Sequence, residues 1–194
     1  MDFNKIKSIL STKTVGIAGC GGLGSNCAVA LARVSIGKLI ICDFDSIEPG
    51  NLNRQYFFYN QLGMMKATAL KENIQNINPR VDVEAHIIKL DPEHIIKIFA
   101  GCDVIVEAFD RADMKKMILE TVLGKMPDKP IVSGMGIAGW GNSNEIRMTQ
   151  SGNLYICGDG HSEATEDNPP LAPRVGMAAN MQANTVLEII LGKN

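Results

Sequence analysis

The sequence predicts one α/β domain: an open, mostly parallel sheet with helices on both faces and a glycine-rich antiparallel extension near the C-terminal third. Three observations support this fold class. A glycine cluster joins a short apolar run to an amphipathic helix, continuous apolar runs recur along the chain, and segments with helical periodicity alternate with them. Continuous apolar runs are typical of strands that are buried on both faces, as in a parallel sheet.

The first unit of this fold surrounds the glycine cluster. Residues 14–18 form the expected first strand, and Gly19, Gly21 and Gly24 follow with the spacing G-x-G-x-x-G. A helix and the apolar run 38–43 come next. A strand, a helix and a strand within about 30 residues make a Rossmann-like βαβ unit, which binds a phosphate or pyrophosphate at the glycine turn.

Acidic and polar side chains follow the second strand. Asp43 lies about 20 residues beyond the glycines, where such folds place an acid that binds ribose hydroxyls. Asp45 comes two residues later, where it can cap the loop. The irregular loop 46–55 contains Arg54, which is either a phosphate-binding cation or an ordinary surface residue.

A lysine on an inward helix face is the next candidate. Residues 62–78 are predicted to form a helix that Pro79 closes. Lys66 lies four residues before Leu70, at the head of the apolar stripe. A lysine in that place either meets an anion or reaches solvent from the edge of the core.

A further acid ends the apolar run 103–110. Asp110 stands directly before a helical segment. It therefore either caps that helix or holds Mg²⁺ at bound phosphates, because Mg²⁺ favours carboxylate and phosphate oxygens.

The remaining elements are assigned from periodicity and turn residues. They are an N-terminal helical segment (1–13), a helix from the glycines to about residue 37, a strand (81–90), a helix (92–100), a strand (130–134), a glycine-rich segment (135–142) that continues as a sheet extension to 149, a strand (153–157), a mobile crossing loop (158–170) and a final helix (173–191). On the final helix, Met177 and Met181 face either the core or a second subunit.

The composition limits the function. The chain has 194 residues, which suits a single domain over 1–194, and its net charge of −2 makes nucleic acid an unexpected partner. No apolar run reaches about 18 residues and no signal-peptide pattern is present, so no membrane segment is expected and the cytoplasm is the expected location. The five cysteines include no C-x-x-C pair, which excludes a four-cysteine zinc site within the chain.

Together, several motifs resemble the ThiF/MoeB/HesA family, the bacterial relatives of ubiquitin-activating enzymes. The motifs are Gly19-x-Gly21-Gly22-Leu23-Gly24-Ser25, Asp43-Phe44-Asp45, Asn51-Leu52-Asn53-Arg54-Gln55, Lys66 and Asp110. The resemblance runs from about residue 14 to the end, and it is specific because the motifs keep their order and spacing. The compact size and the lack of zinc cysteines look most like the short ThiF-type proteins of thiamine biosynthesis.

The resemblance implies an ATP-dependent adenylation. Such enzymes bind Mg-ATP and the Gly-Gly tail of a small ubiquitin-like sulfur carrier, ThiS in the thiamine case, and commonly form homodimers. The tail carboxylate attacks the α-phosphate and pyrophosphate leaves. Nucleotide binding falls by position to Gly19, Gly21, Gly22, Leu23, Gly24, Asp43, Asp45, Asn51, Arg54, Gln55, Lys66 and Asp110. Of these, Arg54, Lys66 and Asp110 are the implied catalytic residues, and Asp110 is the implied Mg²⁺ ligand.

The sequence departs from the family pattern in its N-terminal segment and its cysteines. Many relatives place an N-terminal arginine in the partner subunit's ATP site, but this segment offers only Lys5, Lys7 and Lys13. Some relatives use a crossing-loop cysteine for a persulfide or thioester step. Cys157 is the one candidate for such a nucleophile, and the alternative is a simple thiol at a strand end. The thin carrier tail suits a glycine-rich strand edge at 134–142.

Two other functions remain open from the sequence. An NAD-dependent oxidoreductase uses the same glycine turn, although it gives no reason for the polar set that follows. A non-catalytic ATP-binding scaffold related to activating enzymes is the second alternative, and it has little use for an intact polar set.

Overall fold

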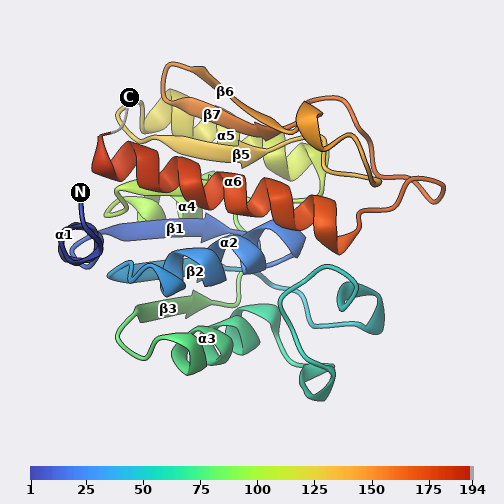
Figure 1. Cartoon of the computed structure of the whole chain (residues 1–194), viewed down its shortest axis with the longest axis horizontal. Helices are drawn as coiled ribbons and strands as arrows, with labels where there is room; N and C mark the ends of the chain where they lie inside the picture. Colours follow the sequence, from blue (N-terminus) through green and yellow to red (C-terminus); the bar gives the residue numbers. More distant parts are fainter. Residues whose placement is uncertain (193–194) are drawn as a thin grey trace.

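In the computed structural model, which describes residues 1–192, the chain forms a seven-stranded sheet in the order β3-β2-β1-β4-β5-β7-β6 (Figure 1). The strands are β1 (Thr14–Ala18), β2 (Lys38–Cys42), β3 (Asp82–His86), β4 (Val104–Glu107), β5 (Ile131–Gly134), β6 (Arg147–Ser151) and β7 (Leu154–Gly158). All neighbouring pairs are parallel except β6 with β7. The predicted open, mostly parallel sheet is therefore confirmed.

Helices cover both faces of the sheet, as predicted. They are α1 (Phe3–Leu10), α2 (Gly22–Arg33), α3 (Lys66–Ile77), α4 (Pro92–Phe99), α5 (Ala112–Lys125) and α6 (Ala172–Leu191). In Figure 1, α2 and α6 lie in front of the sheet, and α4 and α5 lie behind it. None of the helices within residues 1–192 combines the length and the apolarity that a bilayer span needs.

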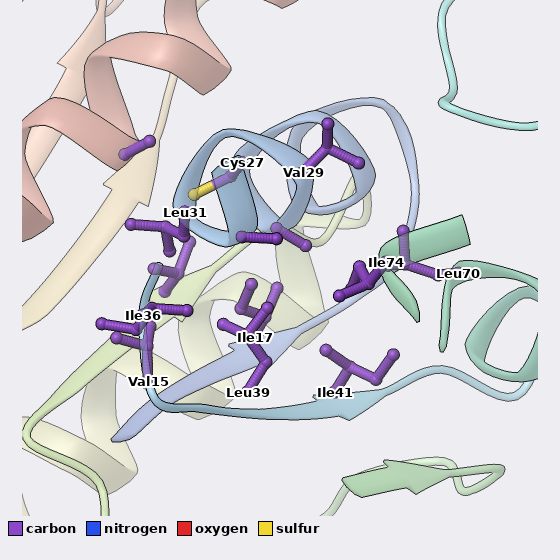
Figure 2. Packing of buried hydrophobic residues seen from close by; sticks show 14 of the residues in the cluster. Val15, Ile17, Cys27, Val29, Leu31, Ile36, Leu39, Ile41, Leu70 and Ile74 are labelled. Atoms are coloured by element: carbon purple, nitrogen blue, oxygen red, sulfur yellow. The ribbon is translucent and has the colours of Figure 1, made fainter. Parts of the chain in front are cut away.

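The alternation of side chains along β1 and β2 divides the core between the two faces. Val15 and Ile17 of β1, with Leu39 of β2, join the cluster under α2 and α3, as Figure 2 shows. Ala18 and Ile40 point to the other face and pack with residues of α4 and α5. Burial on both faces explains why the strand sequences are apolar without interruption.

Two predicted helix boundaries are wrong by several residues, and the backbone gives the reason. The helix expected over 62–78 begins only at Lys66, because Gly63 has a φ of 82° and Met65 is extended. The helix expected to reach residue 37 ends at Arg33, because Ser35 adopts a left-handed φ of 67°. A left-handed residue ends a regular α-helix.

The glycine-rich segment 135–142 is not a strand, which corrects that prediction. Gly136, Gly139 and Gly141 have φ values of 73°, 78° and 74°, which no regular strand contains. The antiparallel extension itself is present, but it consists of β6 paired with β7. The crossing loop then leads from β7 to α6 with a single isolated bridge, between Gly139 and Pro170.

The strand order places a ligand crevice at a definite position. β1 and β4 are neighbours, although α2 leads from β1 to β2 on the other side. In open α/β sheets, ligands bind beyond the carboxyl ends of the strands where the order reverses. Here that position lies between the glycine turn after β1 and the segment after β4.

Candidate active site

The glycine turn is packed so tightly that Gly19 and Gly24 leave no room for a side chain. Gly19 has a φ of 98°, and a Cβ atom there would lie 2.8 Å from the carbonyl oxygen of Ala108. A Cβ at Gly24 would lie 1.8 Å from the carbonyl oxygen of Gly19. The turn thus brings α2, which begins at Gly22, directly onto the end of β1. The free N–H groups of that helix start favour an anion.

Asp43 connects the end of β2 to the glycine turn. Its Oδ2 accepts the N–H of Cys20 at 2.7 Å, and its Oδ1 accepts the N–H of Asp45 at 2.8 Å. Burial raises the pKa of Asp43 above its usual value, against the opposing effect of those two N–H groups. Each carboxylate oxygen keeps a second lone pair for a hydroxyl donor. The carboxylate is therefore at the place where a ribose-binding acid is expected.

Lys66 and Asp45 form an ion pair, so two of the predicted polar residues lie together. Lys66 Nζ lies 2.9 Å from Asp45 Oδ2, and the lysine is only 7% exposed. The backbone N–H of Lys66 also donates to the carbonyl of Asp45. The sequence left open whether this lysine meets an anion, and here the anion is Asp45.

The loop after β2 brings Arg54 and Gln55 onto the glycine turn. Asn26 Nδ2 donates to the carbonyls of Gly22 and Arg54, at 2.7 and 2.9 Å, and so ties the loop to α2. A Cβ at Gly22 would lie 3.4 Å from Arg54 Cγ, and one at Gly21 would lie 3.8 Å from Gln55 Nε2. The guanidinium donates to the carbonyl of Gly50, within its own loop.

Gln55, next to the glycine turn, has a side-chain acceptor that no hydrogen bond uses. Its side chain is buried, and its Oε1 has no hydrogen-bond partner among the described residues. A buried carbonyl oxygen without a partner costs free energy, and functional sites tolerate such groups.

Two predicted nucleotide contacts serve local structure through their side chains. Asn51 Oδ1 accepts the N–H of Glu48 at 3.0 Å and caps the short 3₁₀ helix Pro49–Asn51. Leu23 is 4% exposed and points at Gly134, where a Cβ would lie 2.4 Å from Leu23 Cδ1. The predicted contacts of Asn51 and Leu23 with a nucleotide stay predictions. The side chain of Leu23 packs against Gly134 at the end of β5.

Asp110 lies beyond the carboxyl end of β4, just after two residues that contact the glycine turn. Ala108 and Phe109 precede it, and a Cβ at Gly19 would be 3.4 Å from Phe109 Cδ1. Asp110 is exposed, and it does not cap α5, whose N-cap is Arg111 without a side-chain hydrogen bond. Mg²⁺ takes one or two carboxylates together with phosphate oxygens and water, so an exposed carboxylate is a suitable ligand, and the Mg²⁺ role of Asp110 stays a prediction.

A buried ionic network supports the segment that carries Asp110, and the sequence analysis missed it. Glu107 is fully buried, and its carboxylate lies 2.5 Å from both Lys115 Nζ and Ser133 Oγ. It also accepts the N–H of Phe109 at 2.8 Å. In the sequence, the one sign of this network is an acid, Glu107, inside an otherwise apolar run. The network fixes how the chain leaves β4.

Cys157 does not have the surroundings of a nucleophile. It is fully buried, and its Sγ lies 3.5 Å from Thr185 Oγ1. Burial raises the pKa of the Cys157 thiol to about 11. A protonated and buried thiol is inert at neutral pH. All five cysteines are free and buried.

Comparisons with known proteins identify the family of the chain. The ThiF family model matches residues 4–194. The chain is 32% identical over 190 residues to ubiquitin-like modifier-activating enzyme 5 of Gallus gallus, covering 95% of this chain and 45% of that protein. It is 30% identical over 190 residues to the adenylyltransferase and sulfurtransferase MOCS3 of Xenopus laevis, covering 94% and 42%. The chain therefore spans less than half the length of these curated relatives.

Solved structures show the same fold. The tRNA N6-threonylcarbamoyladenosine dehydratase TcdA of E. coli, solved in complex with AMP, superimposes with a TM-score of 0.88 at 18% identity, over 97% of this chain and 90% of that one. E. coli MccB with ATP gives a TM-score of 0.75 at 23% identity, over 97% and 59%. The match of the family model over nearly the whole sequence, together with this architecture, shows that the chain belongs to the ThiF family.

Proposed function

We propose that this protein adenylates the C-terminal carboxylate of a small ubiquitin-like carrier protein, with Mg-ATP as the second substrate. The observation that carries the proposal is the convergence on one glycine turn of Asp43, the Lys66–Asp45 pair and the Arg54–Gln55 segment. An NAD-dependent oxidoreductase develops no charge on a phosphate during hydride transfer, so it gives no catalytic reason for two cations at this point. The names of the adenylyltransferase and activating-enzyme relatives support the same reaction class.

The proposed reaction joins two negatively charged substrates. A carboxylate oxygen of the carrier attacks the α-phosphorus, the bond from that phosphorus to the bridging oxygen breaks, and pyrophosphate leaves with the electron pair. The products are an acyl-adenylate and pyrophosphate. The carboxylate is already ionised at neutral pH, so no side chain has to remove a proton.

The residues of this chain act by placement and by charge. The N–H groups at the start of α2 and the two cations, Arg54 and Lys66, stabilise the negative charge that develops on the phosphate oxygens. Asp43 orients the ribose through its free lone pairs. Asp110 would hold Mg²⁺, which neutralises phosphate charge when it is bound. The Arg54 guanidinium has to leave the carbonyl of Gly50 to reach a phosphate. That hydrogen bond is exposed to solvent, so the side chain is able to move.

The carrier proposed here is ThiS-like, with a Gly-Gly tail, and the pathway is thiamine biosynthesis. The motif set and the absence of C-x-x-C pairs in the given sequence support that choice over zinc-containing relatives. A homodimer is the proposed assembly. Of the three N-terminal lysines, Lys13 pairs with Asp103, with its Nζ 2.9 Å from Asp103 Oδ1.

Mass spectrometry tests the proposed function directly. Purified ThiS is incubated with this protein and Mg-ATP, and its C-terminus is expected to gain the mass of one AMP. Exchange of labelled pyrophosphate into ATP should appear only when the carrier is present. Tight NAD binding without ATP binding would contradict the proposal, and so would ATP binding without adduct or exchange, which indicates a scaffold.

A further inference from the structure

A buried ion pair at the other side of the crevice has no part in the site described above. Arg174, in the first turn of α6, donates through Nη2 to Asp159 Oδ2, and the two side chains are 5% and 1% exposed. Asp159 Oδ1 accepts the N–H groups of His161 and Ser162, both at 2.8 Å. Buried charges are rare unless they are paired, so this pair holds its surroundings strongly.

The pair joins three segments that are separate in the sequence. Asp159 begins the crossing loop, Arg174 belongs to α6, and Arg174 Nη1 donates to the carbonyl of Gly141 in the glycine-rich segment. Backbone bonds add to this link, since the N–H of Asp159 donates to the carbonyl of Gly136. In Figure 1 the crossing loop extends beyond the carboxyl ends of the strands, next to the start of α6.

The positive-φ glycines of the glycine-rich segment accommodate the crossing loop. A Cβ at Gly136 would lie 1.9 Å from Asp159 Oδ1, and one at Gly139 would lie 2.3 Å from Asn168 Oδ1. The glycines are therefore explained by close contact with the crossing loop, where a free strand edge was expected.

A cavity of about 140 Å³ lies beside the pair, and its walls come from the same three segments. They are residues 138–140, 142 and 145, residues 159, 161, 162 and 168, and Arg174. Arg174 Nε and Ser162 Oγ are buried without a hydrogen-bond partner among the described residues. The shape of this cavity depends on the pair, because the pair fixes all three walls.

The start of α6 also connects the Asp159–Arg174 pair with the glycine turn. Val175 follows Arg174, and a Cβ at Gly22 would lie 3.0 Å from Val175 Cγ1. One turn of helix therefore contacts the glycine turn through Val175 and the crossing loop through Arg174.

We infer that Asp159 and Arg174 are a positioning pair, which locks the crossing loop to the glycine-rich segment and sets the walls between which the carrier's tail binds. Neither residue touches the reacting atoms. The effect on the tail rests on the proposed function, whereas the lock between the two segments does not.

Limited proteolysis tests the lock without any ligand. Glu-C protease cleaves after Glu163 and Glu166, which are exposed in the crossing loop. Asp159→Asn keeps the size of the side chain and an acceptor for the backbone N–H groups, but it leaves Arg174 without a counter-charge. Cleavage should become faster by roughly tenfold or more, because breaking a buried pair favours local opening. Arg174→Lys keeps the charge but has one nitrogen for two acceptors, so it should give a smaller increase.

The matched control is Asp82→Asn, which removes a carboxylate from an exposed pair with Lys38 at the far edge of the sheet. It should cleave at the wild-type rate. Hydrogen exchange of residues 136–142 should rise in Asp159→Asn, less in Arg174→Lys, and not in Asp82→Asn. Circular dichroism and thermal unfolding check that each variant is folded. If Asp159→Asn and Arg174→Lys both kept the wild-type rates of cleavage and of hydrogen exchange, the inference that the pair locks the loop would be wrong.

Steady-state kinetics with ThiS and ATP test the positioning role. Asp159→Asn should raise the KM for ThiS by about tenfold, with the KM for ATP within about twofold of wild type. An equal change in both constants, or none, would overturn the positioning role. If the wild-type protein adenylates no carrier, the proposed function fails, and the cleavage and exchange rates still decide whether the pair locks the loop.

Discussion

Lys66 Nζ lies 2.9 Å from Asp45 Oδ2, and this contact joins the first residue of α3 to the loop after β2. The lysine is nearly buried, whereas the side chain of Asp45 is 50% exposed. The aspartate thus holds the ammonium group at the crevice and can yield to a phosphate, which is a stronger anion.

Replacing Lys66 by methionine should lower pyrophosphate exchange by about a hundredfold or more, because a cation at the developing phosphate charge is lost. The affinity for ATP should fall less than the exchange rate does. Lys71→Met, on the same helix, is the control and should behave as wild type. An exchange rate within a factor of about three of wild type would remove Lys66 from the mechanism.

Arg54→Ala and Asp110→Ala should each nearly abolish carrier-dependent pyrophosphate exchange. Arg54 supplies the second cation, and Asp110 supplies the proposed Mg²⁺ ligand. Exchange assays at increasing Mg²⁺ separate the two, because excess metal should partly restore Asp110→Ala only. Arg80→Ala and Asp82→Ala replace exposed residues of the same types and serve as controls. Retained exchange in either test variant would refute its assigned role.

Gly24→Ala should lower the free energy of unfolding by at least about 2 kcal/mol, since overpacking against backbone is destabilising. The new Cβ would lie 1.8 Å from the carbonyl oxygen of Gly19. Gly124→Ala, in α5 with nothing within 4 Å, should instead stabilise by roughly 0.5–1 kcal/mol. Urea denaturation measures both values. Equal effects of the two substitutions would mean that the turn is looser than the contacts indicate.

Asp159→Asn should lower stability in a pH-dependent manner. Burial by itself raises the pKa of Asp159, but the N–H groups of Ser162 and His161 and the Arg174 guanidinium outweigh it and hold the pKa well below its usual value. A depressed folded-state pKa stabilises the protein above the unfolded value of about 3.9, and this contribution is lost as the pH falls further. The substitution should cost roughly 3 kcal/mol at neutral pH.

Urea denaturation of wild type and Asp159→Asn at several pH values measures that difference. The gap between the two proteins should be constant near neutrality and should narrow in the acid range. A gap that does not change with pH would show that the lost contribution is not the ionised carboxylate.

The cysteine thiols should resist alkylation in the native protein. All five are buried, and the pKa of the Cys157 thiol is raised to about 11 and that of Cys42 to about 12. Iodoacetamide labelling followed by mass spectrometry should modify none of them at neutral pH, and all of them in denaturant. Rapid native labelling of Cys157 would reopen its role as a nucleophile.

The sequence was sufficient for the sheet because local patterns and long-range packing agree there. β1 was predicted with its observed bounds, since an apolar run leads directly into glycines. Asp43 was placed at the glycine turn because the βαβ unit has a nearly fixed geometry. Helix ends were less predictable, since they depend on single backbone angles such as that of Ser35.

Long-range polar pairs could not be predicted. Glu107 and Ser133 are 26 residues apart and meet only because β4 and β5 are neighbours. Arg174 lies in the predicted final helix and Asp159 in the predicted crossing loop, and no pattern in the sequence pairs them. The two residues meet only because the crossing loop brings the chain back to the start of α6, and no local pattern predicts that path.

The glycine-rich segment has one practical consequence. It carries Trp140, the only tryptophan of the chain, with 83% of its surface exposed. Excitation of this indole therefore reports from a single spot on the cavity rim. A change in the fluorescence emission or anisotropy of Trp140 would therefore report binding of the carrier's tail at this cavity in real time, without any attached dye.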